Sequence, residues 1–122
     1  ARENIYIIKW KDWDRMADRR QIYDELLNLQ QEQAAMRNFK DQIYEAIQEL
    51  TDGRNNINNA INEFKKVYTG KAAEEKRKIL NKKIEEINSV INELQERLGE
   101  LNNKINYLNH QIEIKETELR NA

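Results

Sequence analysis

The chain of 122 residues contains no cysteine, no proline and only three glycines. Without cysteine it can form neither disulfides nor thiolate metal sites, which is compatible with the cytoplasm or with secretion from a bacterium. Without proline, and with so little glycine, nothing in the composition forces frequent turns. Long uninterrupted helices are therefore permitted.

The sequence also lacks long hydrophobic runs. The longest run, Ile5 to Ile8, is far shorter than the ~18 apolar residues that a membrane span needs. It is also too short for the hydrophobic region of a secretory signal peptide. We expect no membrane insertion and, if the protein leaves the cell, export without a general secretory signal.

An excess of charge of one sign is missing as well. The 21 basic and 22 acidic residues leave a net charge of -1, so nothing favours nucleic acid as a partner. The charged fraction of 35% leaves little material for a thick globular core. It is sufficient for a thin apolar stripe with solvated flanks.

Residues for catalysis or metal binding are scarce. The single histidine, His110, has no cysteine or second histidine to complete a metal-ligand cluster, and its neighbours are typical of a surface position. The sequence contains no glycine-rich phosphate loop and no nucleophile elbow. We expect no enzymatic activity, no catalytic or metal site and no cofactor.

What the sequence does contain is a heptad pattern in two arms. In the first arm, eleven of fourteen positions spaced alternately three and four residues apart are apolar. These seam positions are Ile22, Leu26, Leu29, Gln33, Met36, Lys40, Ile43, Ile47, Leu50, Arg54, Ile57, Ile61, Phe64 and Tyr68. An apolar period of 3.5 residues over this length predicts a helix whose seam another helix covers.

The second arm continues the pattern to the end of the chain. Its seam positions are Leu80, Ile84, Ile87, Ile91, Leu94, Leu98, Leu101, Ile105, Leu108, Ile112, Lys115 and Leu119. Only Lys115 interrupts this run. The polar seam residues Gln33, Lys40 and Arg54 either specify the register or extend their long stems to water, and most of the many asparagines are expected on outer faces.

The two arms meet at Tyr68-Thr69-Gly70. Gly70 can adopt a positive φ without penalty and suits the position just after a helix end, and Lys65 and Lys66 favour the end of a helix electrostatically. A short turn between two long helices makes them antiparallel neighbours. The sequence therefore predicts an all-α fold, an elongated antiparallel helical hairpin over residues 10-122 with its turn at 68-71. Its coiled-coil-like seam is completed by association with further helices.

Two details of the first arm stay open. Thr51-Asp52-Gly53 resembles a turn, yet the seam keeps its phase across this triplet, which favours a continuous or slightly kinked helix over a break. The N-terminal segment 1-9 and the nearby Trp10 and Trp13 have two interpretations. They form either a frayed terminus or the first turn of the first arm, with the Trp side chains packed on the end of the hairpin, or an extended segment that docks on a partner.

Several apolar residues lie outside the closed seam. Burial of one such Phe or Ile side chain contributes ~1.5–3 kcal/mol, so several of them left exposed would favour association. We therefore expect a helical protein partner. The predicted partner-binding residues are Trp10, Trp13, Ala35, Phe39, Ala46, Ile79, Val90 and Ile114.

The stretch from Ile57 to Leu80, INNAINEFKKVYTGKAAEEKRKIL, resembles the hairpin region of WXG-type proteins of type VII secretion systems. In that family a helix ends in Trp-X-Gly and the next helix opens with small residues; here Tyr68-Thr69-Gly70 is followed by Ala72 and Ala73. The long arms are similar to those of the small helical partners of LXG-type toxins. The resemblance implies a turn motif formed by Tyr68 and Gly70.

The resemblance also implies a function. The chain would be a non-enzymatic targeting partner that binds the helical domain of an LXG-type effector, or another WXG-like hairpin. It would reside in the bacterial cytoplasm or be secreted with its partner through the type VII machinery. The alternative is a generic coiled-coil adaptor that forms a homodimeric four-helix bundle.

Overall fold

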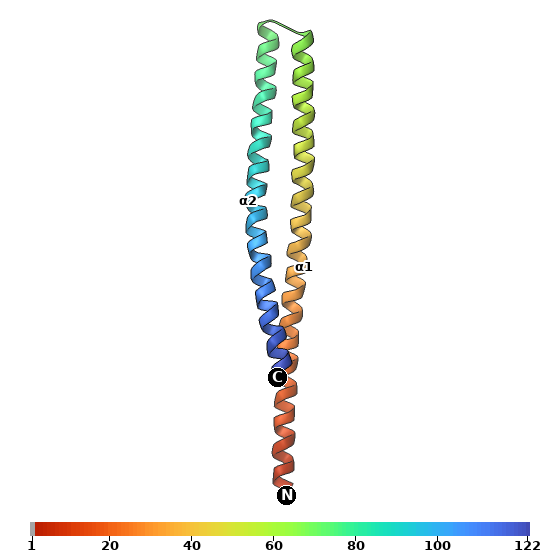
Figure 1. The fold of residues 1–122 in the computed structure, drawn as a ribbon, viewed down its shortest axis with the longest axis vertical. Coiled ribbons are helices and arrows are strands. Elements are labelled where there is room, and N and C mark those ends of the chain that lie inside the picture. Colours follow the sequence, from red (N-terminus) through yellow and green to blue (C-terminus); the bar gives the residue numbers. More distant parts are fainter. Residues whose placement is uncertain (1) are drawn as a thin grey trace. The chain divides into compact units, whose positions relative to one another are not determined.

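The fold is described from a computed structural model, which gives the backbone of residues 2–122 and the side chains of residues 14–122. Two helices, α1 (Arg2–Val67) and α2 (Lys71–Asn121), account for nearly all of the chain. They pack against each other as an antiparallel hairpin (Figure 1). The predicted all-α hairpin is confirmed.

The turn-like triplet Thr51-Asp52-Gly53 does not interrupt α1, which is helical throughout its length. The Thr51 hydroxyl donates a hydrogen bond of 2.7 Å to the carbonyl of Ile47, four residues earlier. It therefore bonds inside the helix and does not cap a new one. At the other end, α1 begins at Arg2, so helix extends into the segment 1-9.

The connection between the helices consists of residues 68–70. The Tyr68 N–H donates a hydrogen bond of 2.9 Å to the carbonyl of Phe64, and this bond is the last helical bond of α1. Gly70 has a φ of +106°, the region that favours glycine. Its carbonyl accepts the Glu74 N–H at 3.1 Å. Gly70 thus occupies the N-cap of α2 and not the position just after α1.

The hairpin divides into two units. Unit 1 combines the N-terminal part of α1, as far as Asn38, with the C-terminal part of α2, from Asn103 onward. Unit 2 comprises Phe39–Asn102 and includes the connection between the helices. In each unit a segment of α1 packs against a segment of α2, so each has its own portion of the seam.

Candidate protein-interaction surface

The seam forms a thin core in both units. Among residues 14–122, seven of the eight buried apolar residues occupy predicted seam positions, and the eighth is Ala73. The most enclosed is Leu108, which is only 2% exposed. The buried seam residues are Leu26, Ile105, Leu108 and Ile112 in unit 1 and Ile43, Ile61 and Ile91 in unit 2. Most other seam residues are half-buried, so the packing of α1 on α2 covers the seam in part.

Two polar seam residues hold the helices in register. The Arg54 guanidinium donates a hydrogen bond of 2.9 Å to Asn88 Oδ1 in unit 2. In unit 1, the Gln33 amide donates to Asn109 Oδ1. Asn88 and Asn109 each lie one residue after a seam position of α2, so these two asparagines serve the seam and not an outer face. Of the two interpretations of Gln33 and Arg54, the structure supports the one in which they specify the register.

Near the connection, the register determines which residues of α2 lie beside those of α1. If the seam positions of the two arms are paired in order outward from the connection, Phe64 lies nearest to Leu80. In the structure Phe64 instead lines a surface hollow with Ala73 and Lys76. The difference follows from the short connection, because two helices joined by three residues pair positions about equally far from Thr69.

Ion pairs bridge the two helices along one edge of the hairpin in unit 1, beside a hollow of about 400 Å³. The Lys115 ammonium lies 2.6 Å from the Glu25 carboxylate and 3.2 Å from that of Glu118. The Lys104 ammonium lies 4.0 Å from Glu32. Glu25 and Glu32 each precede a seam residue of α1, and Lys104 precedes a seam residue of α2. Residues that precede seam positions on the two helices therefore share this edge.

These contacts shift the ionisation of the central pair. The hydrogen bond and the positive charge of Lys115 lower the pKa of the Glu25 carboxyl. The hydrogen bonds from Lys115 to Glu25 and Glu118 raise the pKa of the lysine. Both shifts favour the charged forms, so the pair remains ionised around neutral pH.

In unit 2, the same edge of α1 is apolar. The residues that precede every second seam position there are spaced seven apart and continue the heptad position of Glu25 and Glu32; we call them the apolar edge. The apolar edge comprises Phe39, Ala46, Gly53, Ala60 and Val67. Phe39 is 53% and Val67 71% exposed. Ala60 is also exposed, whereas Ala46 and Gly53 are half-buried. No ion pair crosses between α1 and α2 among the side chains described in unit 2.

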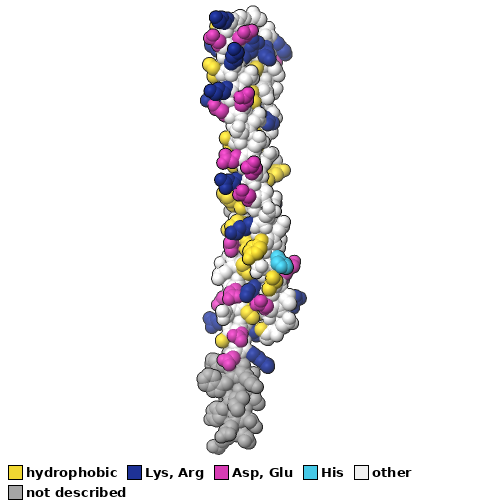
Figure 2. All heavy atoms as spheres, turned by 90° about the vertical axis from the view of Figure 1, so that its left-hand side faces the viewer, with side chains coloured by type: hydrophobic (Ala, Val, Ile, Leu, Met, Phe, Trp, Pro, Cys, Tyr) yellow, Lys and Arg dark blue, Asp and Glu magenta, His cyan; other side chains and the backbone are white. Residues whose placement is uncertain are grey.

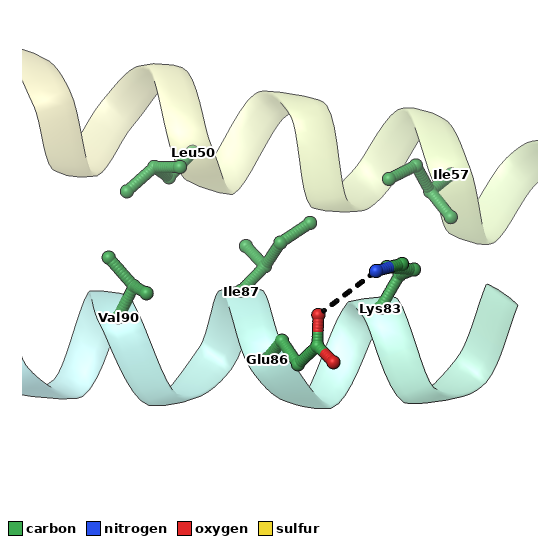
Figure 3. A pocket seen from close by; sticks show the side chains of 6 residues that line it. All are labelled: Leu50, Ile57, Lys83, Glu86, Ile87 and Val90. Carbon is green, nitrogen blue, oxygen red and sulfur yellow. Dashed lines mark hydrogen bonds and ion pairs between the residues drawn. The ribbon is translucent and has the colours of Figure 1, made fainter. Parts of the chain in front are cut away.

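A hollow lies beside the middle of the apolar edge (Figure 3). Its volume is about 310 Å³, and its lining is mostly apolar. Leu50 and Ile57 of α1 extend toward α2, and Ile87 and Val90 of α2 extend toward α1. Lys83 and Glu86 form an ion pair of 3.4 Å at its margin. Gly53 lies midway between Leu50 and Ile57 and contributes no side chain to fill this space.

A second hollow, of about 400 Å³, lies at the connection end of unit 2. Tyr68 stacks on Phe64 with ring centroids 4.9 Å apart, and Tyr68 remains exposed. The aromatic ring of the predicted turn motif thus covers the last turn of α1 and presents one face to solvent.

The predicted partner-binding residues are distributed over both units. Ala35 and Ile114 are exposed in unit 1, and Phe39, Ile79 and Val90 are exposed in unit 2. Ala46 is half-buried. The side chains of Trp10 and Trp13 lie outside the described residues. Phe39 and Ala46 belong to the apolar edge, and Val90 lines the hollow beside it, so these three are brought together on one side of unit 2.

Other exposed apolar residues were not singled out from the sequence. They are Met16, Tyr23, Leu27, Tyr44, Val67 and Tyr107. Tyr23 and Tyr44 each follow a seam residue directly, and Val67 precedes one. Leu27 and Tyr107 flank a seam residue as well, so five of these six residues lie next to seam positions, where the sequence pattern could have indicated them. On the face that Figure 2 presents, hydrophobic side chains alternate with charged ones.

The described residues were compared with the requirements of a metal site and of a membrane span. No group of three His, Asp or Glu side chains among them is placed to hold a metal ion. Within the same residues, neither helix is long and apolar enough to cross a membrane. His110 is exposed. Comparisons with protein-family models, with curated proteins and with solved structures find no match to this chain.

Proposed function

We propose that this chain is a non-enzymatic helical hairpin that binds the helices of another protein through apolar side chains outside its closed seam. The supporting observation is that eleven large hydrophobic residues are exposed among the side chains that the structure describes, and all of them except Tyr68 lie off the seam. Exposed aromatic and aliphatic side chains of this kind are typical anchors of protein interfaces. The hollows are shallow grooves between two helices, unlike the concave pockets that enclose small molecules.

The more specific proposal is that the partner is the helical domain of an LXG-type effector of a type VII secretion system. The hairpin would then assist targeting or export of that effector from the bacterial cytoplasm. Two features support this proposal: the Tyr68-Thr69-Gly70 tripeptide between two long helices, and the small residues Ala72 and Ala73 that follow it.

Coexpression with an LXG-type helical domain tests the proposal. A stable complex is expected on copurification. Tyr107 and Ile114 are exposed seven residues apart on α2 of unit 1, so a Tyr107→Glu/Ile114→Glu variant should weaken binding by about tenfold or more. Asn103→Glu/Asn106→Glu adds the same charge at exposed positions of the same helix and should bind normally. Absence of any complex, with the chain well folded, would reject the effector as partner.

A second candidate function is that of a homodimeric adaptor. The apolar edge of unit 2 favours it, because this edge is a continuous surface that one hairpin leaves open. Light scattering over a range of concentrations distinguishes a stable dimer from a chain that associates only with a different protein.

A further inference from the structure

Gly53 is a residue that the hairpin itself does not require. It lies inside α1, its φ is not positive, and a Cβ added to it would meet nothing within 4 Å. Glycine in a helix interior is less stable than alanine, because it loses more conformational freedom on folding. A helix from outside the hairpin that approaches closely at this point would account for the missing side chain.

The sizes of the residues on the apolar edge are ordered symmetrically about Gly53. Alanines lie seven residues to either side, at Ala46 and Ala60, and the larger Phe39 and Val67 lie fourteen residues to either side. Two straight helices that cross are closest at the crossing point and diverge away from it. Small residues at the centre and larger ones outward match the gap between two such helices.

We propose that a second copy of this chain packs on the apolar edge, with α1 antiparallel to α1 and a two-fold axis at Gly53. A two-fold interface pairs each residue i with j and each j with i. Here Gly53 meets Gly53 of the second copy, Ala46 meets its Ala60, and Phe39 meets its Val67. The four helices then enclose the hollow of each copy, because the missing side chains let Leu50 and Ile57 approach from both sides.

The charges on α2 agree with this axis. The bond between Arg54, the residue after Gly53, and Asn88 places Asn88 within about one residue of the level of the axis. Lys76 and Glu100 lie twelve residues before and after Asn88, and Lys83 and Glu93 lie five before and after. An antiparallel second copy therefore sets these two lysines opposite glutamates.

The same axis accounts for an exposed isoleucine. Ile79, which is 61% exposed, and Arg97 lie nine residues to either side of Asn88. The aliphatic stem of Arg97 from one copy can cover Ile79 of the other. A chain of unrelated sequence would match this pattern of size and charge only by coincidence.

The area is adequate for a stable dimer. From Phe39 to Val67, α1 extends ~42 Å at ~1.5 Å per residue. Two helices side by side present a face ~20 Å wide, which gives ~800 Å² per copy, the usual size of a specific interface. This association uses unit 2 and specifies the geometry of the second candidate function, on which it rests, whereas the test of the effector as partner changes only unit 1. Either can therefore fail while the other succeeds.

Single cysteine substitutions test the axis, because the natural chain has no cysteine. Mild oxidation of Gly53→Cys should yield a covalent dimer, since two residues on the axis lie within disulfide distance. Ala46→Cys alone should not, because its counterpart in the second copy lies ~21 Å away along the helix. A mixture of Ala46→Cys and Ala60→Cys should cross-link into a heterodimer. Gly99→Cys, at another open glycine of a helix, serves as the matched control and should form no covalent dimer.

Sedimentation of the full chain supplies the second measurement. Wild type should be dimeric, and Gly53→Leu should weaken the dimer by about tenfold or more, whereas Gly99→Leu should not. Equal cross-linking of Gly53→Cys and Gly99→Cys, or self-cross-linking of Ala46→Cys, overturns the axis. A wild-type chain that stays monomeric at every concentration overturns the second copy and assigns the apolar edge to a different protein.

Discussion

In unit 1, the residues that precede the seam positions of α1 include Glu25 and Glu32, which pair with lysines of α2. In unit 2, the equivalent residues are Phe39, Ala46, Gly53, Ala60 and Val67. Ion pairs that cross between two helices complete a hairpin without needing a third helix, whereas an apolar edge leaves surface that water solvates poorly. The comparison indicates that ion pairs bridge the two helices along this edge in unit 1, whereas in unit 2 the same edge of α1 is left for association.

The seam is the part that both units share, so damage to it should have the largest effect. Leu108→Ala in unit 1 should reduce the free energy of unfolding by ~3 kcal/mol, because it leaves a cavity in a closed seam. Ile61→Ala in unit 2, where Ile61 is 4% exposed, should have a loss of similar size. Chemical denaturation measures both. Tyr107→Ala, at the exposed neighbour of Leu108, is the control and should lose far less. A much smaller loss for Ile61→Ala would show that the seam is not equally closed.

The connection should be the next most sensitive point, and it belongs to unit 2 alone. Gly70→Val places a β-branched residue at a φ of +106°, which such residues resist, and should destabilise the fold by ~1–3 kcal/mol. Gly99→Val, inside a helix with open space around it, should be neutral. Thermal unfolding compares the two. Equal melting temperatures for Gly70→Val and wild type would mean that the chain does not turn at this residue.

A charge introduced on the apolar edge should weaken association more than it lowers the stability of the fold. Phe39→Glu should leave the melting temperature of the isolated hairpin nearly unchanged, because Phe39 is half exposed. It should weaken association by about tenfold or more, since burying a phenylalanine contributes ~1.5–3 kcal/mol. Gln48→Glu, at an exposed position of the same helix, is the control. Analytical ultracentrifugation and a pull-down measure the result, and unchanged association would exclude Phe39 from any interface.

Gly53→Ala should affect the stability of a single hairpin differently from that of a hairpin whose apolar edge is covered. At low concentration the substitution should stabilise α1 by up to ~1 kcal/mol, the difference in helix propensity. At high concentration the gain should shrink, because two added methyl groups meet where the helices are closest. Gly99→Ala should give the same gain at both concentrations. An equal gain for Gly53→Ala at both would indicate that nothing approaches Gly53.

Much of the fold could be predicted from the sequence, because a heptad seam is a periodic signal repeated over many turns. The continuity of α1 through Thr51-Asp52-Gly53 was predicted correctly, since Leu50 and Ile57 stay in phase across it. The cap role of Gly70 was not, because the sequence does not show that α1 ends two residues earlier. A helix end depends on a few hydrogen bonds, and several neighbouring residues can satisfy them.

The candidate surface was harder to predict. Phe39, Ile79 and Val90 stand out in the sequence because they are apolar and lie off the seam. The apolar edge as a whole does not, since Gly53 and the alanines carry little hydrophobicity of their own. Its pattern becomes visible only when the register is known, and the register depends on Arg54 and Asn88, which lie far apart in the sequence.

The smallest expected effect concerns the ion pairs of unit 1. The lowered pKa of Glu25 means that its contribution is complete above the ordinary carboxyl pKa of ~4.3 and is lost as pH falls through the lowered value. The raised pKa of Lys115 means that its contribution is complete below the ordinary pKa of ~10.4 and is lost as pH rises through the raised value. Lys115→Met removes the pair, so its melting temperature should differ from wild type most in the neutral range and least at both extremes. Lys83→Met in unit 2 removes an exposed pair within one helix and should show a weaker dependence on pH. A difference for Lys115→Met that is constant from acid to alkali would mean that unit 1 gains nothing from the charges on its edge, and the contrast with unit 2 would then rest on the apolar edge alone.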